Sequence, residues 1–172
     1  MPDDVEDTLK WLPSIALFGG LEEPTLRRLL GMMQTLRFEP GQAVCRQDEV
    51  GRSMFLIRSG EVIVCRDSGE RRIKMVRMGP GEFFGEMTLI DPQKRSATVM
   101  VEKAAVLFSL SNRDLYRLFR EDVPGYVMIL QNLCRELSRR LRATNARLQA
   151  LAEERGDDDQ TQIRPALRPK PI

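Results

Sequence analysis

The stretch Phe83–Val99 reads FFGEMTLIDPQKRSATV and places a glycine, a short helical turn and an arginine in sequence. Gly85 lacks a Cβ atom, so its backbone can approach a ligand closely. Residues Glu86–Leu89 can form one helical turn, whose backbone N–H groups and positive dipole end would face an anion. The planar guanidinium of Arg95 can hold two phosphate oxygens at once, and Ser96 can donate a further hydrogen bond. The stretch therefore predicts a site for a ligand that carries a phosphate group.

The order and spacing of these residues make the pattern specific. A single Gly-Glu pair is ordinary turn chemistry, and an isolated Arg-Ser pair usually lies on the surface. Here Glu86 is also placed to accept a hydrogen bond from a sugar hydroxyl, while Asp91-Pro92 ends the helical turn. Residues Ala97–Met100 then continue as a strand, which would fix Arg95 against a sheet. The stretch thus offers partners for both a phosphate and the sugar next to it.

Short β-rich runs alternate with glycine turns on both sides of this stretch, from Leu36 to Leu110. Many short strands at regular spacing predict an antiparallel sandwich or barrel. Ser68-Gly69 lies between two alternating runs and predicts a hairpin. Further turns are expected at Pro40-Gly41, Ser59-Gly60 and Gly79-Pro80-Gly81. The predicted strands are Ala43–Arg46, Met54–Arg58, Val62–Arg66, Ile73–Met78, Thr98–Val101 and Val106–Leu110.

Helical patterns flank the β-rich region. Residues Val5–Met33 have apolar side chains at helical spacing, with a break at Gly19-Gly20 and a second helix expected to begin at Glu22-Glu23-Pro24. Ser111 or Asn112 can cap a short helix. Pro124 can open a long helix that runs to about Glu154. We therefore expect one domain at residues 1–154, followed by a flexible tail at 155–172, which is polar and contains three aspartates and three prolines.

The run Phe84-Gly85-Glu86, a short helix and Arg95-Ser96-Ala97-Thr98-Val99 closely resembles the phosphate-binding cassette of the cyclic nucleotide-binding domain family. The resemblance covers roughly Leu9 to Leu151. It implies an α+β, mainly β fold: a β jelly roll flanked by N-terminal helices and a long C-terminal dimerisation helix, with the ligand inside the roll. Other segments that resemble the family are Leu17–Leu21, Phe38–Gly41, Met54–Val62 and Gly79–Gly85.

By the same resemblance, Gly85, Met87, Arg95 and Ser96 would bind the phosphate through backbone N–H groups and side chains, and Glu86 would bind the ribose. Bacterial cyclic AMP sensors of the family carry a serine beside the cassette arginine, as Ser96 does here, whereas cyclic GMP sites often carry a threonine. The resemblance therefore favours cyclic AMP as the ligand. Cyclic GMP and a cyclic dinucleotide stay open as alternatives.

The long helix carries a heptad pattern of apolar residues. It is compatible with a parallel coiled-coil dimer or with a helix that packs on its own barrel. Thr144 interrupts the pattern, and it resembles a position from which catabolite activator-type regulators contact adenine. Asn145 departs from the serine of that group, while Arg140 matches an arginine near the ribose-binding glutamate. The pattern consists of Leu130, Leu137, Thr144 and Leu151, with Cys134, Leu141, Leu148 and the adjacent Leu133.

Composition narrows the function classes. The 172 residues have a formal net charge of +2 and contain no histidine, which excludes serine–histidine and cysteine–histidine nucleophile pairs. No apolar run is long enough to span a membrane, and the acidic N-terminus is not a signal peptide. We therefore expect a cytoplasmic protein without a metal or cofactor. Cys45, Cys65 and Cys134 are too few and too widely spaced for a disulfide framework and are expected to be buried.

The leading hypothesis is a dimeric cyclic AMP-binding sensor without catalysis, which signals to an unknown protein partner through movement of the long helix. A DNA-binding regulator is disfavoured because no helix-turn-helix fits into the 18 residues after Glu154. No direct contact with DNA or a membrane is expected. The alternatives are a dimerisation or docking scaffold of the same fold that no longer binds nucleotide and, least favoured, an enzyme.

Overall fold

The computed structural model describes residues 5–69, 71–91 and 93–154. The chain divides into two compact units, with the boundary between Glu136 and Leu137. The first unit holds all of the strands and most of the helices. The second unit, as far as the structure describes it, is a single helical segment. The two units are described separately below.

The N-terminal segment of the first unit is helical, as predicted, and is interrupted before Gly20. It forms α1 (Val5–Trp11), a 3₁₀ helix η1 (Leu12–Ser14) and α2 (Glu23–Met32). Proline lies in the first turn of α2, where its missing N–H is tolerated. The predicted start of this second helix is therefore confirmed. Apolar side chains from these helices and the intervening turn are buried: Leu9, Leu12, Ile15, Leu17, Phe18, Leu26 and Leu29.

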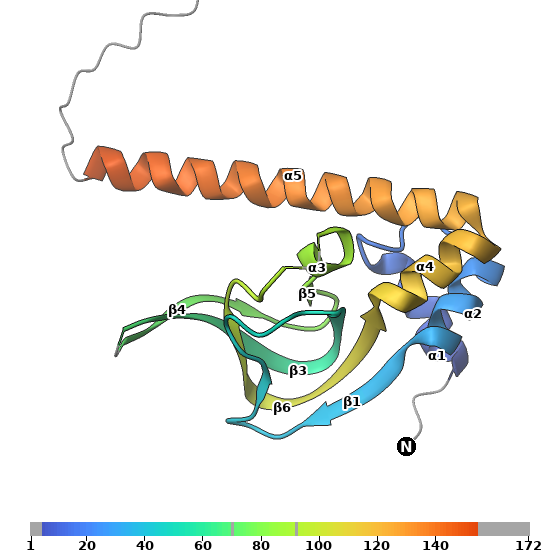
Figure 1. Cartoon of the computed structure of the whole chain (residues 1–172), viewed down its shortest axis with the longest axis horizontal. Coiled ribbons are helices and arrows are strands. Elements are labelled where there is room, and N and C mark those ends of the chain that lie inside the picture. The colour runs from blue at the N-terminus through green and yellow to red at the C-terminus, as the bar shows by residue number, and fades with distance from the viewer. Residues whose placement is uncertain (1–4, 70, 92, 155–172) are drawn as a thin grey trace, which may run out of the picture. The chain divides into compact units, whose positions relative to one another are not determined.

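An antiparallel sheet forms the body of the first unit (Figure 1). Its main path runs β1-β6-β3-β4, with β2 paired to β6 and β5 paired to β3. This arrangement confirms the predicted jelly roll flanked by helices. The strands are β1 (Gln34–Phe38), β2 (Ala43–Cys45), β3 (Ser53–Ser68), β4 (Arg71–Met78), β5 (Phe83–Phe84) and β6 (Thr98–Ser111).

Two strands are longer than the sequence pattern predicts. The runs at 54–58 and 62–66 belong to the continuous strand β3, and those at 98–101 and 106–110 belong to β6. The predicted turn at Ser59-Gly60 is wrong, because Gly60 makes a bulge within β3. Its φ is +87°, and a Cβ there would lie 2.6 Å from Ala105 Cα. The pairing between β3 and β6 shifts register on both sides of this bulge, so the strand bends without ending.

The core of the roll is formed by inward-facing side chains of its strands. Phe55 and Phe84 stack with their ring centroids 5.3 Å apart, which joins β3 to β5 at the start of the Phe83–Val99 stretch. Burial of each such side chain contributes about 1.5–3 kcal/mol. The cluster contains Cys45, Phe55, Ile57, Val62, Met78, Phe84, Val99, Val101, Ala105 and Leu107.

Two helices follow the sheet. Helix α4 (Asn112–Glu121) is capped by Ser111, one of the two predicted caps, whose hydroxyl accepts from the backbone N–H of Asp114 in a reciprocal capping box. Helix α5 (Val123–Glu154) has the predicted length. Its first half is anchored within the first unit, because the Asn132 side-chain amide donates to the carbonyls of Leu17 at 3.1 Å and Gly19 at 2.8 Å.

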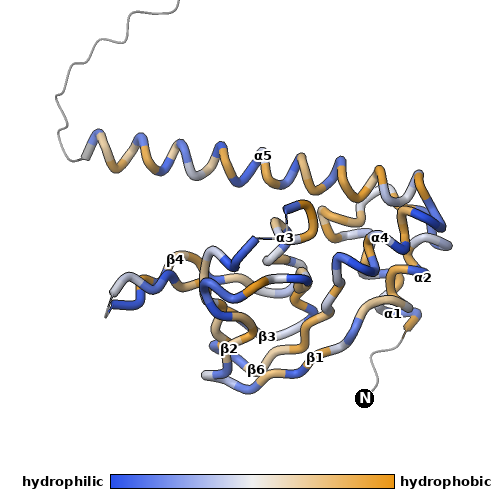
Figure 2. The backbone as a smooth tube through the Cα atoms, in the orientation of Figure 1, coloured by the Kyte–Doolittle hydropathy of each residue, from blue (hydrophilic) through white to orange (hydrophobic). Residues whose placement is uncertain are grey.

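The remainder of α5, residues 137–154, forms the described part of the second unit. Hydrophobic and hydrophilic residues alternate along α5 (Figure 2). Leu141, Leu148 and Leu151 are exposed. In the part of the chain that the structure describes, no helix is long and apolar enough to cross a membrane. The flexible tail predicted for residues 155–172 lies outside the described residues.

The prediction that all three cysteines are buried is wrong for one of them. Cys45 on β2 and Cys65 on β3 are buried, whereas Cys134 is exposed on α5. Its neighbour Leu133 is fully buried, together with Ile129 one turn earlier. Successive helical residues point about 100° apart, so Leu133 packs into the first unit while Cys134 faces outward. Leu133 therefore belongs to the core and not to an exposed stripe.

Candidate functional site

The Phe83–Val99 stretch, called the cassette below, lies on the sheet and begins with strand β5. Phe83 and Phe84 pair with Leu56 and Phe55 of β3. Gly85 follows with φ +73°, a left-handed conformation that favours glycine. Helix α3 (Met87–Ile90) comes next, and Asp91 ends it. The predicted single helical turn after Gly85 is therefore present; Pro92, predicted to help end it, lies outside the described residues.

Arg95 is the central charged group of the cassette. It is only 8% exposed. One terminal nitrogen, Nη2, donates to the carbonyl of Ser53 at 2.6 Å, and Nη1 donates to the carbonyl of Gly85 at 3.3 Å. The guanidinium carbon lies 5.5 Å from the centroid of the Phe55 ring. None of the ion pairs found among the described residues involves Arg95, so it is a buried cation held by neutral acceptors.

The loop between β2 and β3 fixes the backbone at Arg95. The N–H of Asp48 donates to the Arg95 carbonyl at 2.9 Å, and the Arg95 N–H donates to the Glu49 carbonyl at 2.8 Å. Val50 and Lys94 form a neighbouring bridge. These contacts fix the backbone of Arg95 in space, and the carbonyls of Ser53 and Gly85 orient its side chain.

The other predicted phosphate and ribose residues differ in exposure. Glu86, at the start of α3, is only 6% exposed, which is unusual for a carboxylate and fits a specific polar role. Met87 is 59% exposed and Ser96 is exposed as well. The structure thus brings Arg95, near the end of the cassette, into contact with Gly85, which precedes Glu86 and Met87 near its start, while Ser96 follows Arg95 at the surface. Their contacts with a ligand stay predictions.

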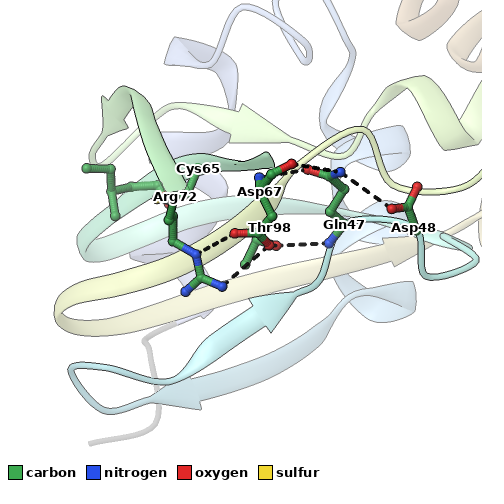
Figure 3. Close-up of polar contacts among 7 residues, drawn as sticks. Gln47, Asp48, Cys65, Asp67, Arg72 and Thr98 are labelled. Carbon is green, nitrogen blue, oxygen red and sulfur yellow. Dashed lines mark hydrogen bonds and ion pairs between the residues drawn. The ribbon is translucent and has the colours of Figure 1, made fainter. Parts of the chain in front are cut away.

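A polar network that the sequence analysis missed holds the end of the cassette (Figure 3). The Thr98 hydroxyl donates to Asp67 Oδ2 at 3.0 Å and accepts from the Gln47 N–H at 3.0 Å. Arg72 Nε donates to Asp67 Oδ1 at 2.6 Å. The bond from Arg72, followed by that from Thr98, lowers the pKa of Asp67. The signal in the sequence was a threonine at an inward position of a β-branched run.

A second set of contacts links α3 to α4. The Thr88 hydroxyl donates to the Gly85 carbonyl at 2.8 Å. The Asn112 side-chain amide donates to the Thr88 carbonyl at 2.7 Å, and the Asn112 N–H donates to the Arg52 carbonyl at 2.9 Å. Sequence analysis identified Asn112 only as an alternative cap. The structure shows that it ties the cassette helix to the helix that follows the sheet.

The predicted base-binding residues lie on the second unit. Thr144 and Asn145 are exposed, and the Thr144 hydroxyl donates to the Arg140 carbonyl at 2.9 Å, one turn earlier in the same helix. Arg140 is partly exposed. Because these residues belong to a unit described by itself, their predicted role at the base stays a prediction.

The cassette lies next to the apolar core, in which Cys45 is buried together with Phe55 and Phe84. Burial raises the pKa of the Cys45 thiol, and the positive charge of Arg95 opposes part of that shift. Among the described residues, no group of three or more His, Cys, Asp or Glu side chains is arranged to hold a metal ion. The arrangement can therefore offer hydrogen-bond donors and one positive charge to an anion.

Comparison with known sequences places this geometry in a family. The family model described as "Cyclic nucleotide-binding domain" matches residues 35–122. The chain is 32% identical over 143 residues to the "Cyclic AMP receptor protein" of Thermus thermophilus, covering 80% of this chain and 62% of that protein. It is 34% identical over 140 residues to the "CRP-like cAMP-activated global transcriptional regulator" of Mycobacterium tuberculosis, covering 80% of this chain and 60% of that protein.

Solved structures agree with this assignment. The Thermus thermophilus catabolite activator protein superposes with a TM-score of 0.70 at 31% identity, covering 80% of this chain and 63% of that one. A cyclic nucleotide-binding domain from Methylobacillus flagellatus gives a TM-score of 0.75 at 27% identity, covering 84% and 82%. The chain thus spans less than two thirds of the first two sequence relatives. It belongs to the cyclic nucleotide-binding domain family.

Proposed function

We propose that this protein is a non-enzymatic sensor that binds cyclic AMP, with the cassette as the phosphate and ribose site. The observation that carries the proposal is Arg95. Among the ion pairs of the described residues none involves Arg95; a buried cation held by neutral acceptors is costly, and an anion that enters its site removes that cost. A ligand with one phosphate charge matches the one positive charge of this guanidinium.

The hydrogen-bonding capacity of Arg95 supports a phosphate diester. A guanidinium has five N–H donors. Arg95 uses one from each terminal nitrogen on the carbonyls of Ser53 and Gly85, so each terminal nitrogen keeps a second N–H that takes no part in these two bonds. Bidentate contacts to phosphate oxygens have the geometry that a planar guanidinium favours. In the proposal, backbone N–H groups near Gly85 and Met87 and the Ser96 hydroxyl provide further donors.

Glu86 is proposed to accept a hydrogen bond from the ribose 2′-hydroxyl. It is buried beside Gly85, at the start of α3, and a sugar attached to the phosphate would lie next to it. Preference for cyclic AMP rests on the two relatives above, whose names specify it, and on Ser96 beside the arginine. Thr144 and Asn145, with Arg140 nearby, are proposed to meet the base.

Dimerisation through α5 is proposed as the route by which binding becomes a signal. Leu141, Leu148 and Leu151 are exposed on one helix at heptad spacing, together with Cys134. A second copy that packs against these residues would bury them in a coiled coil. Ligand binding would then bias the position of α5 and pass the change to a protein partner, because a ligand shifts whichever state it binds better.

Calorimetric titration of the chain with cyclic AMP, cyclic GMP and cyclic di-GMP tests the function. We expect cyclic AMP to bind with one site per chain and more tightly than the other two. A cyclic di-GMP preference would favour the alternative exemplified by a c-di-GMP-responsive Xanthomonas regulator that is 26% identical to this chain. If no nucleotide bound below about 100 μM, a free energy of roughly −5.5 kcal/mol, the docking-scaffold alternative would replace the sensor.

A further inference from the structure

The guanidinium of Arg95 packs closely against two glycines, Gly51 and Gly85, and this position is called the slot below. A Cβ atom placed on Gly51 would lie 2.7 Å from Arg95 Nε and 2.8 Å from Arg95 Cζ. It would also lie 2.6 Å from the Thr88 methyl carbon. A Cβ on Gly85 would collide with Arg95 Nη1. No side chain larger than hydrogen fits at either glycine while Arg95 keeps this position.

The two glycines are required for different reasons. Gly85 has a φ of +73°, so its backbone conformation alone disfavours other residues. Gly51 is not among the residues with positive φ, and its backbone therefore accepts alanine without strain. What Gly51 provides is space for the Arg95 side chain. A change of Gly51 to alanine acts on the arginine and Thr88 and leaves the local backbone conformation allowed.

The loop that carries Gly51 also holds the main chain of Arg95. Asp48 and Glu49 bond to both sides of the Arg95 peptide, and the Gly51 N–H lies 3.4 Å from the Gln93 carbonyl. An alanine at position 51 therefore cannot be accommodated by a shift of the Arg95 backbone without breaking these bonds. The flexible end of the side chain would move instead, away from the carbonyls of Ser53 and Gly85.

We infer that Gly51 is a positioning residue for the phosphate site: its missing side chain holds the Arg95 guanidinium in the orientation that receives the phosphate. The inference rests on the proposed function for its ligand, while the slot itself belongs to the ligand-free protein. Group placement to within a fraction of an ångström determines how well a site binds, so a displaced guanidinium loses its phosphate contacts.

The slot is tested first without any ligand, by nitrogen NMR of the arginine side chains in the 172-residue chain. We expect slow rotation and resolved Nη signals for Arg95, assigned by their absence in Arg95→Ala. Gly51→Ala should average or shift these signals. Gly79→Ala, where a Cβ meets nothing within 4 Å, should leave them unchanged. Averaged Arg95 signals in the wild type would overturn the slot, whether or not the protein binds a nucleotide.

Binding of cyclic AMP tests the role of the slot. Gly51→Ala should weaken affinity about tenfold or more, the scale of hydrogen bonds to a charged group, while Gly79→Ala should not. In an Arg95→Ala background, Gly51→Ala should cause no further loss, because coupled residues are non-additive. Additive losses, unchanged affinity or tighter binding would each overturn the inference.

Thr88 supplies the control for the second contact of the added methyl group. Thr88→Ser removes the methyl carbon that lies 2.6 Å from a Cβ at position 51 and keeps a hydroxyl for the bond to the Gly85 carbonyl. If the loss from Gly51→Ala persists in the Thr88→Ser background, it arises at Arg95. If Thr88→Ser restores full affinity, the collision with Thr88 is the cause and the inference is wrong.

Discussion

The cassette and the outer part of α5, residues 137–154, differ in which kinds of side chain they bury and expose. The cassette buries charged side chains, since Glu86 is 6% exposed and Arg95 is 8% exposed. The segment from residue 137 exposes apolar surface, with Leu141 at 62% and Leu148 at 60%. Burying a charge costs free energy, and exposing a row of leucines leaves apolar surface in water. Each arrangement therefore favours binding of a partner.

This difference separates the two partners that the protein is proposed to have. For the buried cation, the proposed partner is the phosphate of a small anion. The exposed leucines are completed by an apolar surface, for which a second α5 is proposed. The first half of α5 lies between these cases, since Ile129 and Leu133 are fully buried in the first unit. The following changes test whether the contrast holds.

The largest effect on stability is expected when a buried leucine of α5 is changed to alanine, and an exposed leucine of the same helix provides the comparison. Leu133→Ala should destabilise the first unit by about 2–5 kcal/mol, because it opens a cavity at a side chain that is 0% exposed. Leu141→Ala makes the same chemical change at an exposed site and should lower dimer affinity with little effect on unfolding of the first unit. Urea unfolding and light scattering measure the two effects. Equal destabilisation by both changes would contradict the contrast.

Removal of the buried cation has the next largest effect. Arg95→Ala should weaken cyclic AMP binding by about 1.5–3 kcal/mol, roughly ten- to a hundredfold, through loss of charged hydrogen bonds. Arg37→Ala removes an exposed arginine on β1 and serves as the matched control. Isothermal titration of both variants gives the comparison. Unchanged affinity in Arg95→Ala would place the phosphate site elsewhere.

A smaller effect is expected at the junction of α4 and α5. The Thr25 hydroxyl donates to Asp122, and the Gly125 N–H donates to it at 3.0 Å; these bonds lower the pKa of Asp122. Because the pKa is lower in the folded state, the stabilisation is present above the unfolded value of about 3.9 and is lost as pH falls through the folded value.

Asp122→Asn should therefore cost about 0.5–1.5 kcal/mol at pH 7 and progressively less as the pH falls below about 4. Thermal unfolding across this pH range measures the difference. Glu39→Gln makes the same carboxylate-to-amide change at an exposed turn and should have little effect. A deficit in Asp122→Asn that stayed constant down to pH 2 would show that its ionisation is not involved.

The smallest effect is expected at the proposed base contacts. Thr144→Val removes the hydroxyl and keeps the shape, and should weaken cyclic AMP binding by about 0.5–1.5 kcal/mol at most, the value of a neutral hydrogen bond. Asn145→Ala should reduce the preference for cyclic AMP over cyclic GMP. Ser138→Ala, also on an exposed part of α5, is the control. If Thr144→Val and Ser138→Ala had the same effect, Thr144 would have no role at the base.

Sequence patterns predicted the elements whose causes are local. Gly85, the helical turn after it and the start of α4 at Ser111 follow from backbone preferences and capping, which act over a few residues. The positions of most strands were also predicted, yet the lengths of β3 and β6 were not. Ser59-Gly60 was expected to form a turn because it separates two β-rich runs, but the left-handed φ of Gly60 belongs to a bulge, which glycine accommodates as readily as a turn.

The features that the sequence did not reveal depend on contacts between distant segments. Ser53 and Gly51 lie over 40 residues before Arg95. Ser53 binds its guanidinium through a backbone carbonyl, and Gly51 leaves space for it because it has no side chain. Neither leaves a signature in residue type or spacing. The predicted burial of Cys134 was also wrong, because which face of a helix is buried depends on how the helix packs against the rest of the fold. Strand β1, paired with β6, was missed as well.

A crystal structure of the chain with cyclic AMP tests the central claim most directly, since that claim assigns one ligand group to one side chain. The phosphate oxygens should lie about 2.7–2.9 Å from the Arg95 guanidinium nitrogens, the distance of a charge-assisted hydrogen bond. The ribose 2′-hydroxyl should contact Glu86. A bound nucleotide whose phosphate made no contact with Arg95 would contradict the account.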